Sequence, residues 1–340
     1  MTKPKTMLPG HLMITLLVIT LLGAAGNGGP APAADPMPSW HDTTAKQAVL
    51  AFVERVSTPG SPDFVPVAER IAVFDNDGTL WPENPVPFQA AFLLDELKRM
   101  APEHPEWSDN PALAAALAGD VTAVRQAGPE ALAELLAATH VGMTADEFNR
   151  RVRTWLDTAR HPRFARRYHD LAYQPMLELL SHLRERGFST WIVSGGGADF
   201  MRVWAEDVYG IPPSQVIGSY SKLRYEMRNG TPMLIKEAGI ELIDDKAGKP
   251  VGIHRFIGRR PIACFGNSDG DLEMLEYTTI NHTPSLGLIV HHTDGDREYS
   301  YDARPQSTGR LVTALEDADA RGWIVVDMAR DWKTVFRPEP

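Results

Sequence analysis

The chain has 340 residues, of which 43% are hydrophobic and 23% charged, and its formal net charge is −10. This composition excludes a disordered or fibrous protein and predicts one large or two modest globular domains. No basic run or basic helix face stands out, so the sequence predicts no nucleic-acid partner.

Residues 1–34 have the pattern of a secretory signal peptide. Lys3 and Lys5 make the start positive, residues 12–22 are apolar or threonine, and an Ala-x-Ala-like cleavage site lies near Ala33 or Ala34. We therefore expect the protein to be exported, to a periplasm or outside the cell, with no stable membrane association after cleavage. An uncleaved membrane anchor is the alternative, although the apolar run is shorter than the ~20 residues of a spanning helix.

A pair of carboxylates follows the first predicted strand. Apolar residues at helical spacing predict a helix over 42–56, and Ile71 to Phe74 reads as a short buried strand that leads directly into Asp75, Asp77 and Thr79. Open α/β sheets bind their ligands at the carboxyl ends of strands, so both carboxylates are expected in one cavity. One carboxylate can attack phosphorus, and a second can transfer the proton. A strand that ends in an acidic turn is the alternative for this motif alone.

Residues 85–173 show helical patterns and no strand pattern. Helices are predicted over 89–100, 111–118 and 129–139, and Thr144 begins a capping-box sequence ahead of a fourth helix. The insert is interpreted as a helical cap over the site, with an ordinary helical insertion as the alternative. A basic cluster near its end is interpreted as a solvated face; it comprises Arg163, Arg166 and Arg167.

A second strand, predicted over 188–193, ends in Ser194 and three glycines before a helix predicted over 199–208. A hydroxyl group and a glycine turn at the start of a helix can bind phosphate, because backbone N–H groups and the helix dipole both favour an anion. A flexible glycine turn is the alternative.

Lys249 and an oxygen-rich turn complete the set of candidate site residues. Lys249 opens a helix predicted over 251–257, where a cation opposes the helix dipole, so we expect it to neutralise a bound phosphate. The strand predicted over 261–265 then leads to residues 266–271, whose side-chain oxygens suit Mg²⁺. Asp269 in this turn is interpreted as a turn or capping carboxylate.

The remaining elements extend the sheet. Residues 219–237 are expected to form a hairpin around Asn229-Gly230, strands are predicted over 286–290 and 323–328, and a helix over 308–320. The polar residues after the strand at 286–290 are expected to form a loop at the mouth of the site rather than a second metal centre; they are His291, His292, Asp294 and Asp296.

The four motifs, in this order, resemble the signatures of the haloacid dehalogenase superfamily, in its phosphatase branch, and most of all the phosphoserine phosphatase-like members. The resemblance implies an α/β fold: a Rossmann-like, doubly wound, mainly parallel sheet from residues 40–84 and 174–335, with an inserted all-helical cap at 85–173. It implies that Asp75 is the nucleophile and Asp77 the acid and base. It also implies a phosphate-binding set of Thr79, Ser194, Gly195 and Lys249, with Thr79 orienting Asp77.

The resemblance further implies a Mg²⁺ ion held by Asp75, Asp77, Asn267 and Asp271. The fourth signature usually has an aspartate where this chain has Asn267, which leaves open whether Asn267, Asp271 or both complete the metal site. Glu83 is a candidate substrate ligand, because phosphoserine phosphatases bind the substrate amine through a glutamate one position further on.

The implied function is Mg²⁺-dependent hydrolysis of a small phosphomonoester through an aspartyl-phosphate, with phosphoserine or a phosphorylated amino alcohol as candidate substrates. The acid Asp77 argues against dehalogenation, because a halide leaving group needs no proton. A non-catalytic phosphate-ligand binding protein of the same fold is the alternative, and Asn267 is its support. A phosphomutase is a third interpretation.

Overall fold

The computed structural model describes residues 1, 34–120, 122–123, 128–303 and 309–337. The predicted signal peptide therefore lies almost entirely outside the described residues. The chain divides into Met1–Asp35 and Pro36–Pro340, and the fold below is that of the second unit. Within the described part of the chain, no helix combines the length and the apolar character needed to cross a membrane.

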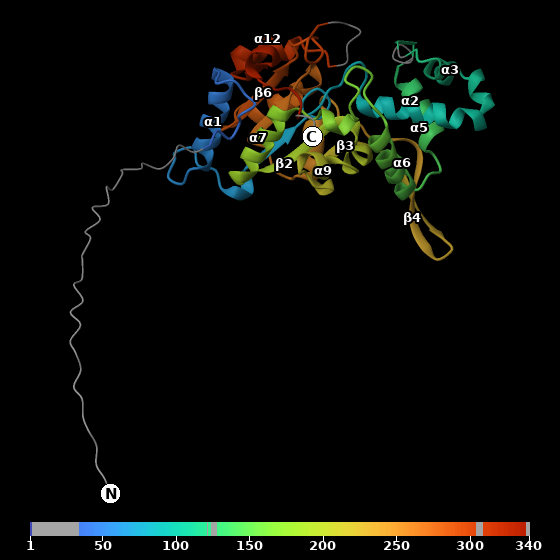
Figure 1. Ribbon diagram of the computed structural model, residues 1–340, viewed down its shortest axis with the longest axis horizontal. Helices are drawn as coiled ribbons and strands as arrows, with labels where there is room; N and C mark the ends of the chain where they lie inside the picture. The colour runs from blue at the N-terminus through green and yellow to red at the C-terminus, as the bar shows by residue number, and fades with distance from the viewer. Residues whose placement is uncertain (2–33, 121, 124–127, 304–308, 338–340) are drawn as a thin grey trace. The chain divides into compact units, whose positions relative to one another are not determined.

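Seven strands form one sheet in the order β4-β3-β2-β1-β5-β6-β7, and every neighbouring pair is parallel except β3 and β4. This confirms the predicted Rossmann-like, mainly parallel sheet (Figure 1). The strands are β1 Ile71–Phe74, β2 Ser189–Gly197, β3 Val216–Arg228, β4 Thr231–Leu242, β5 Ala263–Gly266, β6 Leu286–His291 and β7 Ile324–Asp327.

Strand β1 lies at the centre of the sheet and is buried on both faces. Ala72 and Phe74 belong to one apolar cluster, and Ile71 and Val73 belong to the other, as expected for side chains that alternate along a strand. The chain continues from β1 to β2 on one side and places β5 on the other, so the direction of winding reverses at β1. That reversal is where open α/β sheets bind ligands.

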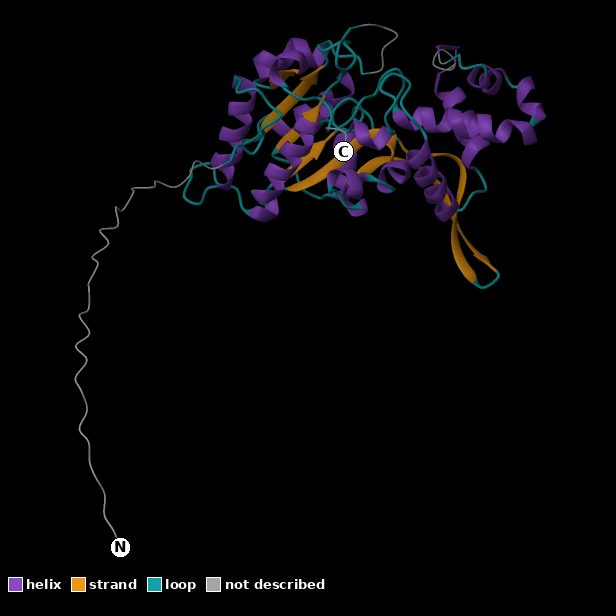
Figure 2. Cartoon of the chain, in the orientation of Figure 1, coloured by secondary structure: helices purple, strands orange, loops and turns teal. Residues whose placement is uncertain are grey.

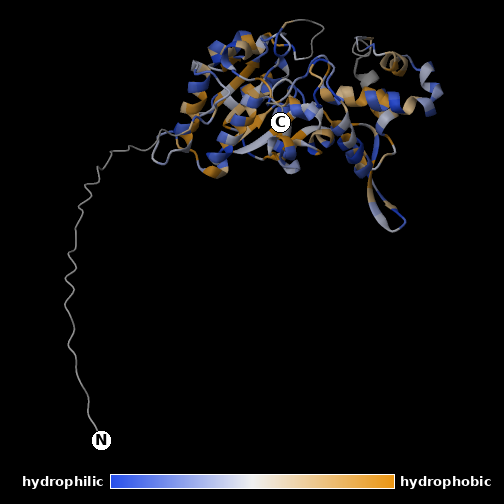
Figure 3. Ribbon diagram, viewed as in Figure 1, coloured by the Kyte–Doolittle hydropathy of each residue, from blue (hydrophilic) through white to orange (hydrophobic). Residues whose placement is uncertain are grey.

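Helices bury their apolar sides on both faces of this sheet. Residues of α1 Thr44–Ser57 and α7 Gln174–Glu185 join the larger cluster, whereas residues of α11 Leu272–Thr279 and α12 Thr313–Arg321 join the smaller one. Hydrophobic and hydrophilic residues accordingly alternate along these helices (Figure 3). The other helices outside the insert are α8 Ala198–Arg202, α9 Ala205–Tyr209, α10 Gly248–Phe256 and α13 Met328–Asp331, with 3₁₀ turns at Val67–Glu69, Pro213–Gln215 and Asp269–Asp271.

Two predicted helices differ from the observed ones. The helix predicted over 199–208 is broken into α8 and α9, because Trp204 leaves helical geometry and stacks on Trp81 with ring centroids 4.0 Å apart. The helix predicted over 308–320 begins only at Thr313, where the Asp269 carboxylate accepts hydrogen bonds from the Val312 and Ala314 amides at 3.0 Å. This contact confirms the interpretation of Asp269 as a capping residue.

The insert at 85–173 contains helices and loops, and no β-strand lies among its described residues (Figure 2). Thr144 and Glu147 form the predicted capping box. The α2 and α6 helices bury Phe92 and Phe148 in the larger cluster of the sheet. The helices are α2 Phe88–Met100, α3 Pro111–Leu117, α5 Gly128–His140 and α6 Ala145–Thr158, with 3₁₀ turns at Ala101–Glu103, Pro105–Asp109 and Tyr168–Leu171.

The β3–β4 hairpin packs against this insert. Its turn is the predicted Asn229-Gly230, with φ of 52° and 79°, which confirms the hairpin. The Lys236 amide donates to the Met143 carbonyl at 2.9 Å, and the Gly142 amide donates to the Lys236 carbonyl at 2.9 Å. The Lys236 ammonium also lies 2.5 Å from the Asp199 carboxylate, directly after the glycines of β2. Strand β4 therefore joins the helical insert to the part of the core that carries the second motif.

Candidate active site

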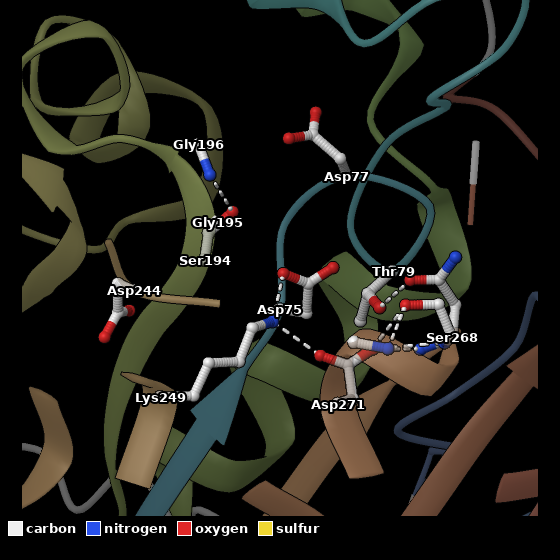
Figure 4. A network of polar contacts seen from close by, with 12 residues as sticks. Asp75, Asp77, Thr79, Ser194, Gly195, Gly196, Asp244, Lys249, Ser268 and Asp271 are labelled. Carbon is white, nitrogen blue, oxygen red and sulfur yellow. Dashed lines mark hydrogen bonds and ion pairs between the residues drawn. The ribbon is translucent and has the colours of Figure 1, made fainter. Parts of the chain in front are cut away.

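Strand register brings three of the four motifs to one edge of the sheet. Phe74 pairs with Ile192 on one side and Phe265 on the other, and the Asp75 amide donates to the Phe265 carbonyl at 2.9 Å. Ser194, two residues after Ile192 in β2, and Asn267, two residues after Phe265, therefore flank Asp75. Figure 4 shows that Lys249 of α10 also reaches this group.

Lys249 lies between two buried carboxylates. Its ammonium is 2.7 Å from Asp75 Oδ1 and 2.5 Å from Asp271 Oδ1, and all three residues are at most 6% exposed. Burial raises the pKa of Asp75, and the nearby Lys249 ammonium opposes this rise. The two carboxylates explain a lysine in the first turn of a helix, because an ion pair at this distance outweighs the dipole penalty.

The second acid, Asp77, points away from Asp75 toward the glycines of β2 (Figure 4). The Trp81 indole N–H donates to Asp77 Oδ1 at 2.7 Å, and a Cβ atom on Gly196 would lie 3.4 Å from Asp77 Oδ2. Burial raises the pKa of Asp77 to about 6, although the Trp81 bond lowers it. A carboxyl group with this pKa can both donate and accept a proton near neutral pH.

The second motif is not the predicted turn: strand β2 continues through residues 194–197, and its register with β3 shifts between Val193 and Gly197. Ser194 is buried, and its Oγ accepts the Gly196 amide at 3.2 Å. The Gly197 amide donates to the Gln89 side chain of α2 at 2.7 Å, which ties the end of this strand to the helical insert. Strand β2 runs through Gly197, and the helix after it has only five residues. The Ser194 hydroxyl and nearby amides, more than a helix dipole, are thus the groups that can hold an anion.

Asn267 and Asp271 occupy different environments. Asp271 Oδ2 accepts the amides of Asn267 and Ser268 at 2.9 and 3.1 Å, while its Oδ1 contacts Lys249. Asn267 Oδ1 instead accepts the Thr79 hydroxyl at 3.2 Å. The second Asp75 oxygen points away from Lys249, toward Thr79 (Figure 4). The side-chain oxygens of Asp75 and Asn267 are hard donors of the kind that suits Mg²⁺, which keeps several waters and needs few protein ligands.

Glu83 is buried behind Asn267. Its Oε1 accepts the Asn267 amide N–H at 2.6 Å and the Tyr301 hydroxyl at 2.7 Å. Burial raises the pKa of Glu83 well above its usual value. His292 lies on the same side, where its ring contacts the Gly78 carbonyl at 2.7 Å and the Glu298 carboxylate at 2.9 Å.

The other polar residues singled out in the sequence make structural contacts. Arg163 donates to the Gly295 carbonyl at 2.7 Å, and Arg167 pairs with Asp170 at 2.8 Å. Arg166 donates to the carbonyls of Asp170 and Arg337. Among the described residues, no cluster of three or more His, Cys, Asp or Glu side chains has metal-site geometry.

Sequence reasoning missed four contributors to the site. Trp81 is only four residues after Asp77, and this short distance along the chain was the one signal that could have predicted their hydrogen bond. Gln89 and Tyr301 contact the site from segments distant in sequence. Asp244, buried at the end of the hairpin near Ser194 and Lys249 (Figure 4), makes no hydrogen bond through either oxygen within the described structure.

Comparison with known proteins gives one family and a set of distant structures. One is a conserved protein of unknown function from Anaerococcus prevotii DSM 20548, with 16% identity, coverage of 73% of this chain and 85% of that chain, and a TM-score of 0.48. A second is a protein of unknown function from Bordetella pertussis Tohama I, with 17% identity, coverage of 76% of this chain and 99% of that chain, and a TM-score of 0.47. A third is a phosphoserine phosphohydrolase-like protein from Francisella tularensis subsp. tularensis SCHU S4, with 15% identity, coverage of 74% of this chain and 98% of that chain, and a TM-score of 0.38. A search of curated proteins finds no match. The model of the haloacid dehalogenase-like hydrolase family matches residues 72–276. Because that match spans more than half of the chain and includes all four motifs, the protein belongs to the haloacid dehalogenase-like hydrolases.

Proposed function

We propose that the protein is a Mg²⁺-dependent phosphomonoester hydrolase that works through an aspartyl-phosphate. The observation that carries this proposal is the meeting of Asp75, Asp77, Ser194 and Lys249 at one edge of the sheet. Nucleophile, proton carrier and anion-binding groups are then all within one site.

In the first step, an Asp75 carboxylate oxygen attacks phosphorus in line with the ester oxygen. The new P–O bond to Asp75 forms as the bond to the leaving oxygen breaks. Asp77 transfers its proton to that oxygen, so the product leaves as an alcohol and Asp77 becomes a carboxylate.

In the second step, Asp77 takes a proton from a water molecule, which attacks the phosphorus of the aspartyl-phosphate. The bond between phosphorus and Asp75 breaks, and inorganic phosphate is released. Asp77 is then protonated again and ready for the next turnover. The pKa of about 6 suits a group that must hold this proton and release it in turn.

Charge stabilisation comes from the residues around the phosphoryl group. The Ser194 hydroxyl and the Gly195 amide donate hydrogen bonds to phosphoryl oxygens, and the Lys249 ammonium balances their charge. Asp271 positions Lys249 and closes the turn after β5. When bound, Mg²⁺ neutralises phosphoryl charge, and Asp75, the Asp77 carbonyl and Asn267 would hold it. In this assignment Asp271 acts through the lysine, and Asn267 is the metal ligand.

The substrate class is a small phosphomonoester, with phosphoserine and phosphorylated amino alcohols as first candidates because of the resemblance to phosphoserine phosphatase-like proteins. We also propose export, supported by the leader pattern of residues 1–34. An exported enzyme of this kind would release phosphate from metabolites outside the cytoplasm.

The test is a panel of phosphorylated metabolites and an aryl phosphate, given to the mature protein with and without Mg²⁺. Wild-type protein is expected to release phosphate only with Mg²⁺, and Asp75→Asn is expected to release none. Phosphate binding without turnover of any panel member would instead favour the non-catalytic binding protein.

A further inference from the structure

The unusual feature of the metal site is an amide where the family signature has a carboxylate. Asn267 is 1% exposed and offers the site an oxygen without a charge. Its two polar side-chain atoms have different partners: Oδ1 accepts the Thr79 hydroxyl at 3.2 Å, and Nδ2 donates to Glu83 at 2.6 Å. A carboxylate accepts but does not donate hydrogen bonds, so Glu83 fixes which end of the amide faces it. The amide oxygen is thereby directed to the side of Thr79 and Asp75.

Glu83 is built into this position. It is 4% exposed, and a second partner, the Tyr301 hydroxyl, donates to the same Oε1 atom at 2.7 Å. Two glycines leave room for it: Gly78 and Gly309 have φ of 80° and 73°, and a Cβ atom on either would collide with Glu83. The carboxyl group is therefore held in one place by hydrogen bonds from two distant segments, at Asn267 and Tyr301.

No cation in the described structure pairs with Glu83. The ion pairs of the described residues include Lys249 with Asp75 and Asp271, but none that involves Glu83. A buried carboxylate without a counter-charge is costly unless something nearby balances it. Glu83 contacts Asn267 directly, so an ion bound to Asn267 would lie near this carboxyl group.

We propose that Glu83 is the positioning residue of the metal site, and that Glu83 and Asn267 together replace the aspartate of the family signature. Asn267 supplies the oxygen that binds the ion, while Glu83 orients the amide and adds the carboxyl group that the amide lacks. This inference rests on the proposed metal-dependent function. It assigns Glu83 to the metal rather than to the amine of a substrate.

Metal affinity tests the proposal without reference to turnover. Mn²⁺ binding is measured by electron paramagnetic resonance on the mature protein, with Mg²⁺ as competitor. Glu83→Gln keeps the shape of the side chain, but a glutamine amide can both accept and donate, so it no longer fixes the orientation of the Asn267 amide. Mutation of groups that orient metal ligands costs about 10–100-fold in affinity, and we expect a loss in that range for Glu83→Gln.

The exchange variant separates a metal role from a merely structural one. Glu83→Gln combined with Asn267→Asp returns one carboxylate to the pair, now at the position of the family signature. We expect the Mn²⁺ affinity of this exchange variant to be at least tenfold higher than that of Glu83→Gln, within the range of such effects. Glu96→Gln is the matched control, because it changes another buried carboxylate in the same way at a place in the helical insert where its partners are Arg99 and Arg151; its Mn²⁺ affinity should equal that of wild type.

Three results would overturn the proposal. Equal Mn²⁺ affinity in Glu83→Gln and wild type removes the role of Glu83 and leaves the phosphatase proposal intact. An exchange variant as weak as Glu83→Gln shows that the pair does not replace an aspartate. A wild-type protein that binds no Mn²⁺ overturns both the metal dependence and this inference. Wild-type protein that binds Mn²⁺ through Glu83 but turns over no substrate would refute the phosphatase activity alone.

Discussion

Lys249→Met is the substitution with the largest stability effect that the site predicts. It removes the only cation that the described structure places between Asp75 and Asp271, 2.7 and 2.5 Å away, and leaves two buried carboxylates facing each other. Breaking a buried ion pair by removing one partner costs about 3–5 kcal/mol. At about 2 °C per kcal/mol for a chain of this size, the Tm should fall by about 6–10 °C.

The assay is thermal unfolding followed by circular dichroism at pH 8 and pH 5, together with phosphatase activity. The matched control is Lys246→Met three residues earlier, where the lysine is exposed and the change should stay within about 0.5 kcal/mol. Because burial raises the pKa of Asp75 and the lost lysine no longer opposes this rise, the Asp75 carboxylate of the variant is more easily protonated. The stability lost in Lys249→Met should therefore be larger at pH 8 than at pH 5.

A second variant, Lys249→Met with Asp271→Asn, removes one of the two unpaired charges. It should recover part of the Tm, although not the activity, because the phosphoryl group still lacks its lysine. A Lys249→Met protein whose Tm matches that of Lys246→Met at pH 8 would refute the conclusion that the lysine holds these carboxylates together.

Three further predictions concern Asp77, Ser194 and Asp244. Asp77→Asn should lower kcat/KM by about 10²–10⁴-fold for alkyl phosphates and less for aryl phosphates. In wild type, kcat/KM for alkyl phosphates should fall as pH rises above about 6, where Asp77 loses its proton. The same pH profile in Asp77→Asn would contradict the role of Asp77 as the acid. Ser194→Ala should lower kcat by about 10²-fold with little change in Tm, and full activity would exclude the hydroxyl from the phosphate site. Burial raises the pKa of Asp244 from 3.8 to about 7. The free energy of unfolding of wild type should therefore decline by as much as about 4 kcal/mol as pH rises through that range. Chemical denaturation at pH 8 should find Asp244→Asn more stable than wild type, and a less stable variant would refute this prediction.

The sequence predicted those features that depend on local pattern. Strand β1 and its two acids and the Asn229-Gly230 hairpin each follow from a few consecutive residues. The turn predicted after Val193 was wrong, because strand β2 continues through Gly197 with a register shift against β3. Parallel pairing then explains why the motifs meet, because Phe74 pairs with both Ile192 and Phe265.

What the sequence did not predict depends on contacts between distant segments. The break between α8 and α9 follows from Trp204 stacking on Trp81, which no local propensity encodes. The contact of β4 with the helical insert depends on the backbone hydrogen bonds of Lys236 with Gly142 and Met143. The environment of Glu83 depends on Tyr301, 218 positions away in the chain. Such contacts become visible only once the fold is known.

Covalent phosphorylation of Asp75 is the central claim, and trapping tests it most directly. Mature Asp77→Asn protein is mixed with Mg²⁺ and an aryl phosphate, whose leaving group needs little protonation, then quenched in acid and reduced with borohydride. Reduction converts an aspartyl-phosphate to homoserine, which peptide mass spectrometry locates. The mechanism predicts homoserine at position 75 and none in the Asp75→Asn protein. Turnover with an unmodified position 75, or with phosphate on another residue, would contradict it.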